Sequence, residues 1–308
     1  MFFDILELPH HITDHDMTRF HHHKKIALWF ILPQLLVTVI FFIWPAINAV
    51  LQSFYYSDAF GLQSRFAGLS NYIDIFYSLE YGHAVLITFV IAASVTLLTM
   101  SFGLAIALLV QGRRRGHGVY KSLLLWPYAV APAVAAVLWR FLCQPHIGWL
   151  TDVLQRFGIE FNDMINPRQA LLVIIITASW QQFSYNFLFY YAALNRIPPS
   201  LLEAATLDGA SSWRRLWQII FPLISPTTFF LVIMNVIYSF FDTFGIIDVI
   251  THGGPEYSTT TLIYKVYEDG FVGMDPGGSS AQSVMLMLLV IALTFIQFRF
   301  LEKKVHYK

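Results

Sequence analysis

Few side chains in this 308-residue sequence are spaced for catalysis or for metal binding. Six of its eleven histidines lie in an N-terminal tract: His10, His11, His15, His21, His22 and His23. Such tracts can bind metal, but neither cysteines nor carboxylates at ligand spacing accompany this one. We therefore interpret residues 1–25 as a solvated tail and predict no metal site. The single cysteine, Cys143, excludes an intrachain disulfide and is expected to be buried and inert.

Phosphate-binding glycine loops and catalytic groupings are also absent from the sequence. It contains neither G-x-x-x-x-G-K-[ST] nor G-x-G-x-x-G after a strand, and no serine, histidine and carboxylate in a shared arrangement. The chain is therefore predicted not to be an enzyme and to need no cofactor, so any ATP must be bound by another chain. With 19 basic and 19 acidic residues, it has no net charge that would favour nucleic acid.

Uncharged polar side chains are concentrated in two apolar segments, residues 169–195 and 216–241. Amides are costly in hydrocarbon unless they are paired or face water. Two interpretations remain open: hydrogen bonds between helices, worth about 1 kcal/mol each, or a hydrated path for a polyol-like solute. The candidate path residues are Tyr185, Asn186, Tyr190, Asn235, Tyr238 and Ser239.

Residues 196–220, between these segments, carry the signals of two short helices joined by a turn. Ser200 and Glu203 have the spacing of a capping box, which predicts that the first helix begins at Ser200. Asp208 and Gly209 are expected to end it, because glycine accepts a positive φ.

A second helix is predicted from Trp213 to Ile220, capped by Ser211 and ended by Pro222. Small and apolar residues line the pair of helices beside charged ones. Such a preformed element suits docking into a groove on a partner protein. The alternative is an amphipathic hairpin lying on the lipid surface.

The composition predicts that these segments belong to a membrane protein. Only 12% of residues are charged, about half the usual fraction of a soluble domain, and the mean hydropathy is +0.58. Six windows of 18 to 32 residues contain no Asp, Glu, Lys or Arg, and a membrane helix needs roughly 20 apolar residues. We predict an all-α integral membrane protein with six transmembrane helices, at about residues 26–52, 84–111, 122–143, 169–195, 221–247 and 278–300.

The third predicted span contains Pro127 and Pro132, so we expect it to be kinked. It can extend through Phe141 and Leu142 if Arg140 reaches the membrane interface. The unequal distribution of lysine and arginine between the loops predicts the orientation of the chain in the membrane. The tail, the 2–3 and 4–5 loops and the C-terminus carry 14 of these residues, and the other loops carry 5. Both termini are therefore expected in the cytoplasm.

The 4–5 loop resembles the EAA loop of ABC-importer permeases, E-A-A-x-x-D-G-A-x8-I-x-L-P, with Phe221 in place of the leucine. The matching residues are Glu203, Ala204, Ala205, Asp208, Gly209, Ala210, Ile219 and Pro222. Within the carbohydrate-uptake type, the chain is most similar to the A-type permease subunits of sn-glycerol-3-phosphate importers. That closer similarity rests on the segments WPYAVAPAVAAVLW, SYNFLFYYAAL, FFDTFGIIDVITHGGP and TTTLIYKVYEDGF.

The resemblance implies a six-span permease domain over residues 26–302 in the bacterial inner membrane. It further implies a heterodimer with a second permease subunit, two copies of a cytoplasmic ABC ATPase, and a periplasmic substrate-binding protein. Residues 196–220 would be the coupling loop that contacts the ATPase. The implied substrate is sn-glycerol-3-phosphate or a related glycerophosphodiester or sugar. The alternatives are a neutral-sugar permease of the same family and, from a different class, an ion-coupled secondary carrier.

Overall fold

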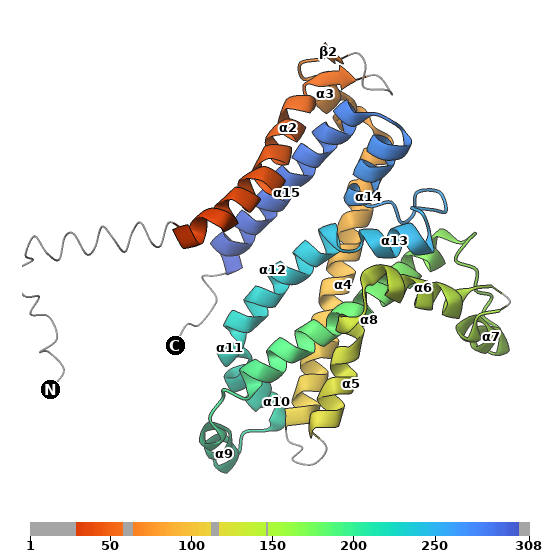
Figure 1. The fold of residues 1–308 in the computed structure, drawn as a ribbon. Helices are drawn as coiled ribbons and strands as arrows, with labels where there is room; N and C mark the ends of the chain where they lie inside the picture. The colour runs from red at the N-terminus through yellow and green to blue at the C-terminus, as the bar shows by residue number, and fades with distance from the viewer. Residues whose placement is uncertain (1–28, 58–63, 112–116, 146, 302–308) are drawn as a thin grey trace, which may run out of the picture. The chain divides into compact units, whose positions relative to one another are not determined.

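The structure is a computed structural model that describes residues 29–57, 64–111, 117–145 and 147–301 (Figure 1). The predicted tail of residues 1–25, with its histidines, lies outside them. The chain divides into two compact units, residues 1–52 and 53–308. Helices dominate the described residues, as predicted, and one short hairpin accompanies them.

The described part of the first unit is one apolar helix, Trp29–Gln52, long enough to cross a membrane. It contains a π-helical turn, η1 (Val39–Ile43), which is followed by α2 (Trp44–Gln52). In the wider turn the Trp44 N–H donates to the Val39 carbonyl. Pro45 comes next and has no N–H to donate, so the π turn lets the helix continue past the proline.

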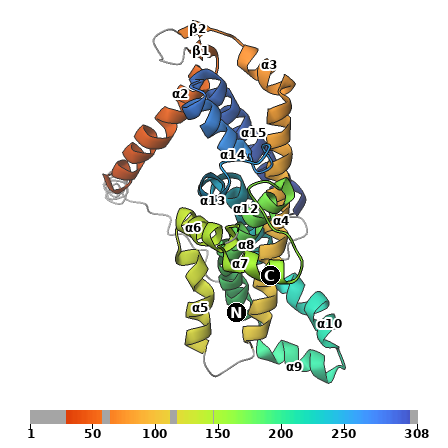
Figure 2. The same ribbon diagram turned by 90° about the vertical axis from the view of Figure 1, so that its right-hand side faces the viewer.

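The second unit begins with an antiparallel hairpin in which Tyr55 pairs with Phe66. Long and short helices follow it (Figures 1 and 2). Its elements in chain order are β1 (Tyr55–Ser57), β2 (Ser64–Phe66), α3 (Ser70–Tyr77), α4 (Leu79–Gln111), α5 (His117–Ala129), α6 (Pro132–Cys143), α7 (Trp149–Arg156), α8 (Pro167–Leu194), α9 (Pro199–Leu207), α10 (Ser212–Arg215), η2 (Leu216–Ile220), α11 (Phe221–Leu223), α12 (Ser225–Phe241), α13 (Phe244–Ile250), α14 (Leu262–Tyr267), η3 (Glu268–Val272) and α15 (Pro276–Leu301).

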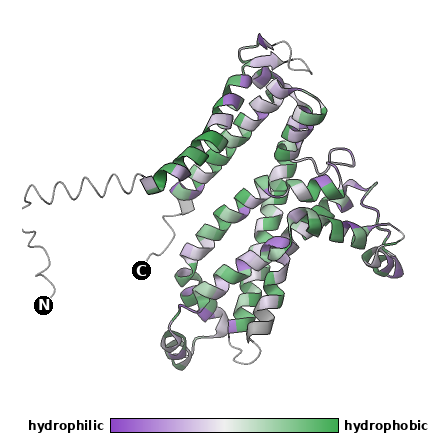
Figure 3. Cartoon of the chain, viewed as in Figure 1, coloured by the Kyte–Doolittle hydropathy of each residue, from purple (hydrophilic) through white to green (hydrophobic). Residues whose placement is uncertain are grey.

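Helices α4 and α8 form the centre of this unit, and α5, α6, α12 and α13 pack around them (Figure 1). One apolar cluster lies between α4, α6, α8 and α13 and contains the buried Cys143. A second joins α4 and α8 to η2 and to the start of α12, and a third joins α4 to α15. Apolar residues run along the long helices, whereas polar residues are prominent at α7 and α9 (Figure 3).

The third predicted span is not a kinked helix but two helices, α5 and α6, that meet at 101°. Pro127 lies inside α5 without ending it. The break comes at Ala131, whose backbone is extended (φ −61°, ψ 142°), directly before Pro132. The residue before a proline is driven out of the helical region, and here that restriction changes the direction of the chain.

Arg140 is held by the end of another helix, and its position relative to the membrane interface stays a prediction. Its guanidinium donates to the carbonyls of Val249 and Ile250, the latter at 3.0 Å. These carbonyls lie in the last turn of α13, where backbone acceptors have no helical partners and attract a cation. Arg140 therefore joins α6 to α13.

Three helices of the described residues are long and apolar enough to span a membrane: Trp29–Gln52, Leu79–Gln111 and Pro276–Arg299. Two further pairs of helices are bent sharply where they meet: α5 with α6, and the 212–223 helix with α12. If each pair makes one span, the described residues have five candidate spans. The chain is therefore an all-α membrane protein with three to five candidate spans. Helix α8 is long enough at 28 residues, but its amides and hydroxyls make it less apolar than these.

Candidate functional site

The predicted coupling loop forms a helix–turn–helix, as expected, but its first helix does not begin at the predicted residue. Helix α9 starts at Pro199, and Pro198 is its N-cap, without a side-chain hydrogen bond. The predicted capping box of Ser200 and Glu203 is therefore wrong. Proline is preorganised for the first helical position, so Pro199 starts the helix before Ser200 can act as a cap. Glu203 is exposed.

The turn after α9 is built on Gly209, whose φ is +77°. The Gly209 N–H donates to the Thr206 carbonyl at 3.1 Å, and the Ala210 N–H donates to the Ala205 carbonyl at 3.0 Å. This pair of bonds is a Schellman motif, which ends a helix through a residue of positive φ. The prediction that Gly209 ends the helix through a positive φ is confirmed. A Cβ at Gly209 would meet nothing within 4 Å, so only its backbone conformation requires glycine.

The second helix begins where Ser211 caps it, as predicted: its Oγ accepts from the Arg214 N–H at 3.3 Å. The Arg215 guanidinium donates to Thr206 of α9 and to Ser212, the latter at 3.2 Å. Arg215 thus ties the two helices together across the turn. The geometry of the element is consequently fixed by backbone and side-chain bonds within residues 199–215.

Pro222 does not end this helix, contrary to the prediction. The π turn η2 precedes it, with the Phe221 N–H donating to the Leu216 carbonyl, and the helix runs on through α11 to Leu223. As at Pro45, the wider turn accommodates the proline. The change of direction, 71°, instead comes at Ile224 between α11 and α12.

The helix–turn–helix has a buried base and an exposed tip. Leu202, Leu216 and Ile220 pack into the apolar cluster of α4 and α8. In contrast, the side chains of Leu207 and Trp213 are 89% and 70% exposed. Of the residues that match the EAA pattern, Glu203, Ala204, Asp208 and Gly209 are exposed, Ala210, Ile219 and Pro222 are half-buried, and Ala205 is buried.

The intramembrane amides pair with one another between α8 and α12. The Asn186 amide donates to Asn235 Oδ1 at 2.9 Å, and the Asn235 amide donates to Asn186 Oδ1 at 2.8 Å. Gln182 adds a third bond to Asn235 Oδ1 at 3.2 Å. Asn186 and Asn235 are fully buried, and a Cβ at Gly103 of α4 would lie 2.8 Å from Asn186 Cβ. This contact cluster, Gly103, Asn186 and Asn235, is called the amide junction below.

A second set of polar bonds connects α8 to the break between α5 and α6. The Gln181 amide donates to the Val130 carbonyl at 2.6 Å, one of the carbonyls that lose helical partners at the break. Its Oε1 accepts from the Tyr238 hydroxyl at 3.2 Å. Gln181 was not among the predicted site residues, although its position in the SWQQ segment was a visible signal.

The six predicted path residues therefore fall into two groups. Asn186, Asn235, Tyr238 and Ser239 are buried and hydrogen-bonded between or along helices. Tyr190 lines a pocket beside α4, and Tyr185 lies against Tyr128 and Phe189. The bonds of Asn186, Asn235 and Tyr238 are those of interhelical packing, whereas Ser239 bonds within α12. A role of these residues in a path stays a prediction.

Lys265 in α14 is a buried cation that the sequence analysis did not single out. Its side chain is 7% exposed, and Nζ lies 3.1 Å from Glu80 Oε2 and 3.2 Å from Asp269 Oδ2. Burial alone would lower the pKa of Lys265, but Asp269 and Glu80 raise it above its usual value. The ammonium is therefore neutralised within the protein and joins α14 to the start of α4.

The comparisons with known proteins agree with this architecture. The family of binding-protein-dependent transport system inner membrane components matches residues 100–307. The sn-glycerol-3-phosphate transport system permease protein UgpA of Brucella abortus biovar 1 (strain 9-941) is 50% identical over 285 residues, which are 92% of this chain and 97% of the relative. UgpA of Yersinia pseudotuberculosis serotype I (strain IP32953) is 50% identical over 277 residues, 90% and 94% of the two chains.

Among solved structures, a chain of a bacterial ABC transporter involved in the import of the acidic polysaccharide alginate has the same fold. The TM-score is 0.80 at 18% identity, over 93% of this chain and 98% of that one. The protein is thus a multi-pass permease of the inner membrane, a transport subunit and not a catalytic chain. It belongs to the inner-membrane components of binding-protein-dependent transport systems, the permease subunits of ABC importers.

The amide junction predicts a difference between two glycines of α4. Gly103→Ala places a Cβ against Asn186 and should lower the thermal unfolding midpoint of the purified transporter, because α4 and α8 must move apart. Gly82→Ala is the control: its Cβ meets nothing within 4 Å, and alanine stabilises a helix by about 1 kcal/mol relative to glycine. Equal midpoints for the two variants would contradict the close approach at Gly103.

Proposed function

We propose that this chain is one permease subunit of an importer for sn-glycerol-3-phosphate, and that residues 196–220 dock on a cytoplasmic ATPase. The observation that carries the docking proposal is the rigid helix–turn–helix, which presents Leu207 and Trp213 to solvent from a buried base. Exposed apolar side chains on a preorganised element are typical of a docking surface. The substrate proposal is supported by two relatives of that name at 50% identity over most of the chain.

The proposed assembly contains a second, different permease subunit, two copies of the ATPase and a periplasmic binding protein. The permease domain would extend over residues 26–302, with α8 as the sixth span. At about 1.5 Å per residue, the 28 residues of α8 reach about 42 Å, more than the hydrocarbon thickness of about 30 Å. Its buried amides have partners in α12 and in the α5–α6 break, which reduces the cost of placing them in a membrane.

The substrate is a phosphate dianion, yet two cations beside the candidate spans already have partners. Arg140 binds the end of α13, and Lys265 binds two carboxylates. We therefore propose that the binding protein contacts the phosphate group and that the permease provides an uncharged path. These contacts also allow the alternative, in which the same kind of permease transports a neutral sugar.

Gly209 provides the test of the docking element. Gly209→Val strains the positive-φ turn by about 1–2 kcal/mol, too little to unfold the protein, but it reshapes the exposed tip. We expect normal membrane abundance, loss of ATPase co-purification and loss of uptake. Gly158→Val is the matched control, because Gly158 has φ +76° and equally open surroundings at the end of α7; it should retain the ATPase.

Glu203→Ala should have a smaller effect than Gly209→Val, because Glu203 neither caps α9 nor forms the turn. Normal uptake by Gly209→Val at wild-type abundance would exclude residues 196–220 as the docking element.

The proposed membrane topology, six spans with both termini in the cytoplasm, requires the α5–α6 pair to cross the membrane. This requirement can be tested separately. Reporter fusions after Lys121 and after Gln155 should then report opposite sides. The same side for both fusions would make α5 and α6 a re-entrant pair and would remove the third span.

A further inference from the structure

Helix α3 turns a polar side toward the protein and an apolar side outward. Asn71 is buried, and its amide donates to the Ser53 carbonyl at 2.8 Å. On the opposite side of the helix Ile73 is exposed, and Phe76 and Tyr77 are 74% and 84% exposed. A helix that borders water has the reverse arrangement, with its apolar stripe toward the core. The outer side of α3 is therefore suited to a membrane interface or to a partner surface.

The position of α3 along the chain favours the membrane interface, because the candidate span α4 follows it directly. The 33 residues of α4 reach about 50 Å, whereas the hydrocarbon core is about 30 Å thick. Glu80 in its first turn is a charged residue that is costly in hydrocarbon. This end of α4 therefore lies at the level of the lipid head groups, and α3 continues from it (Figure 2). Tyrosine is enriched at this level, and Tyr77 and Tyr81 flank the junction of the two helices.

A pocket of about 500 Å³ lies between α3, the start of α4 and α15. Its apolar lining includes Phe76 and Val85 together with Met285 and Leu289 of α15. Tyr81 also lines it and is 8% exposed, and its hydroxyl makes no hydrogen bond among the described residues. That hydroxyl is not one of the polar atoms that are closed off from solvent. The pocket thus combines apolar walls with an accessible phenolic donor at the head-group end of α4.

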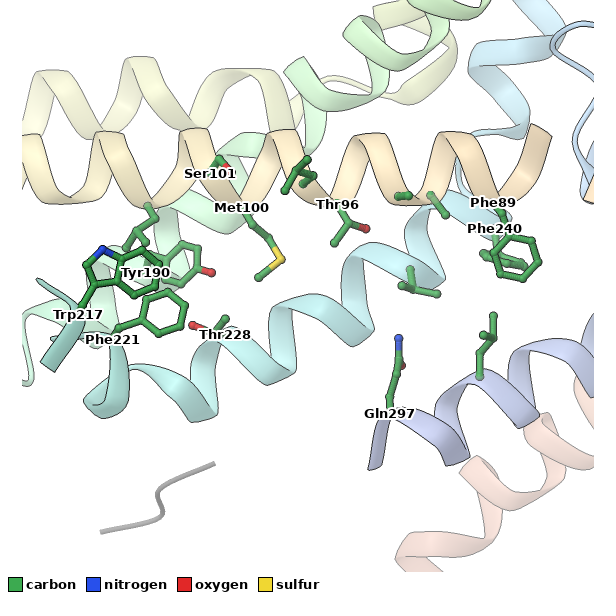
Figure 4. Close-up of a pocket in the computed structure, with 16 residues that line it drawn as sticks. Phe89, Thr96, Met100, Ser101, Tyr190, Trp217, Phe221, Thr228, Phe240 and Gln297 are labelled. Atoms are coloured by element: carbon green, nitrogen blue, oxygen red, sulfur yellow. The ribbon is translucent and has the colours of Figure 1, made fainter. Parts of the chain in front are cut away.

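A larger pocket, of about 640 Å³, follows along the same two helices (Figure 4). Val85 of the first pocket and Phe89 of the second are one turn apart in α4, and Leu289 and Leu293 are one turn apart in α15. Phe89 stands at one end of the larger pocket, and none of the lining residues is charged (Figure 4). Along α4, Phe89 lies about 12 Å beyond Tyr81, within the roughly 15 Å of hydrocarbon in one leaflet. An acyl chain that passes Tyr81 would therefore reach the second pocket.

The occupant must match apolar walls and a free hydroxyl at the head-group end. A transported polyol would leave most of its hydroxyl groups unpaired against the apolar lining. A membrane helix of a partner protein uses its carbonyls within the helix, so its backbone would offer no acceptor to Tyr81. A glycerophospholipid meets both conditions, because its acyl chains are apolar and its ester and phosphate oxygens are acceptors at the level of the head groups.

We propose that α3, the first turns of α4 and α15 form a binding site for a membrane glycerophospholipid. One acyl chain lies in the pocket between them and extends toward Phe89, and the Tyr81 hydroxyl donates to an ester or phosphate oxygen. The apolar side of α3 lies in the head-group layer. The lipid contacts Phe76 of α3 and Leu288 of α15 and thereby joins these two helices. The site is separate from residues 196–220 and does not depend on which solute is transported.

The first measurement tests whether lipid covers α3 in the complete transporter, with Cys143→Ala as the background. A bimane label on Phe76→Cys is compared in nanodiscs of ordinary phosphatidylcholine and of phosphatidylcholine brominated on its acyl chains, because bromine quenches at short range. We expect the brominated lipid to lower the emission at position 76 at least twofold. Ser64→Cys is the control, because Ser64 is an exposed polar residue of the hairpin; its emission should stay unchanged. An unquenched label at position 76 would mean that water or protein covers α3 and would overturn the proposal.

The second measurement is lipid binding by the delipidated complete transporter in detergent, titrated with dioleoyl phosphatidylethanolamine and followed by native mass spectrometry. Tyr81→Phe keeps the ring and should raise the apparent Kd about three- to tenfold, the effect of one lost hydrogen bond. Tyr77→Phe is the matched control, because Tyr77 is exposed and lies outside the pocket; it should leave Kd unchanged. An unaltered Kd in Tyr81→Phe, or an equal rise in both variants, would contradict the site.

Discussion

The amide junction is the contact on which the packing of the second unit depends. Asn186 and Asn235 exchange two hydrogen bonds at 2.8 and 2.9 Å and are fully buried. Each amide satisfies the other where no solvent can. Removal of Asn186 would leave the Asn235 amide N–H without this acceptor, and removal of Asn235 would leave Asn186 Oδ1 without this donor. The pair fits only because Gly103 has no side chain, which allows α4 to approach the backbone of α8. Three long helices are thereby held together at one point.

The helix–turn–helix depends on this packing, because its base is part of the same assembly. Ala107 of α4 and Leu194 of α8 share an apolar cluster with Ile220 of η2. The cluster lies one to two turns from the amide junction along α4 and α8. A displacement of the exposed tip would therefore press on the helices that the junction joins. Under the proposed function, this continuity would connect a docked ATPase to the membrane-spanning helices.

In the predicted coupling loop, the features that depend on neighbouring residues alone could largely be predicted from the sequence. Gly209 and Ser211 act through their own backbone and side chain, so their roles followed from residue type and spacing. The start of α9 and the effect of Pro222 were predicted wrongly, because competing local signals decide them. Pro199 outcompetes Ser200, and a π turn accommodates the ring at Pro222.

Long-range contacts could not be predicted in the same way. Asn186 and Asn235 are 49 residues apart, and a polar residue in an apolar segment does not indicate which helix it meets. At the 101° break between α5 and α6, the donor to the Val130 carbonyl comes from Gln181, 51 residues away.

In the proposed function, the exposed tip of the helix–turn–helix contacts an ATPase. The most direct test of this contact is site-specific photo-cross-linking in the assembled transporter, from position 207, where Leu207 is 89% exposed. Position 157 is the control, because Phe157 is 79% exposed at the end of α7. The account predicts that the ATPase is cross-linked from position 207 and not from position 157. An assembled complex in which position 207 captures only lipid, or in which position 157 captures the ATPase, would contradict it.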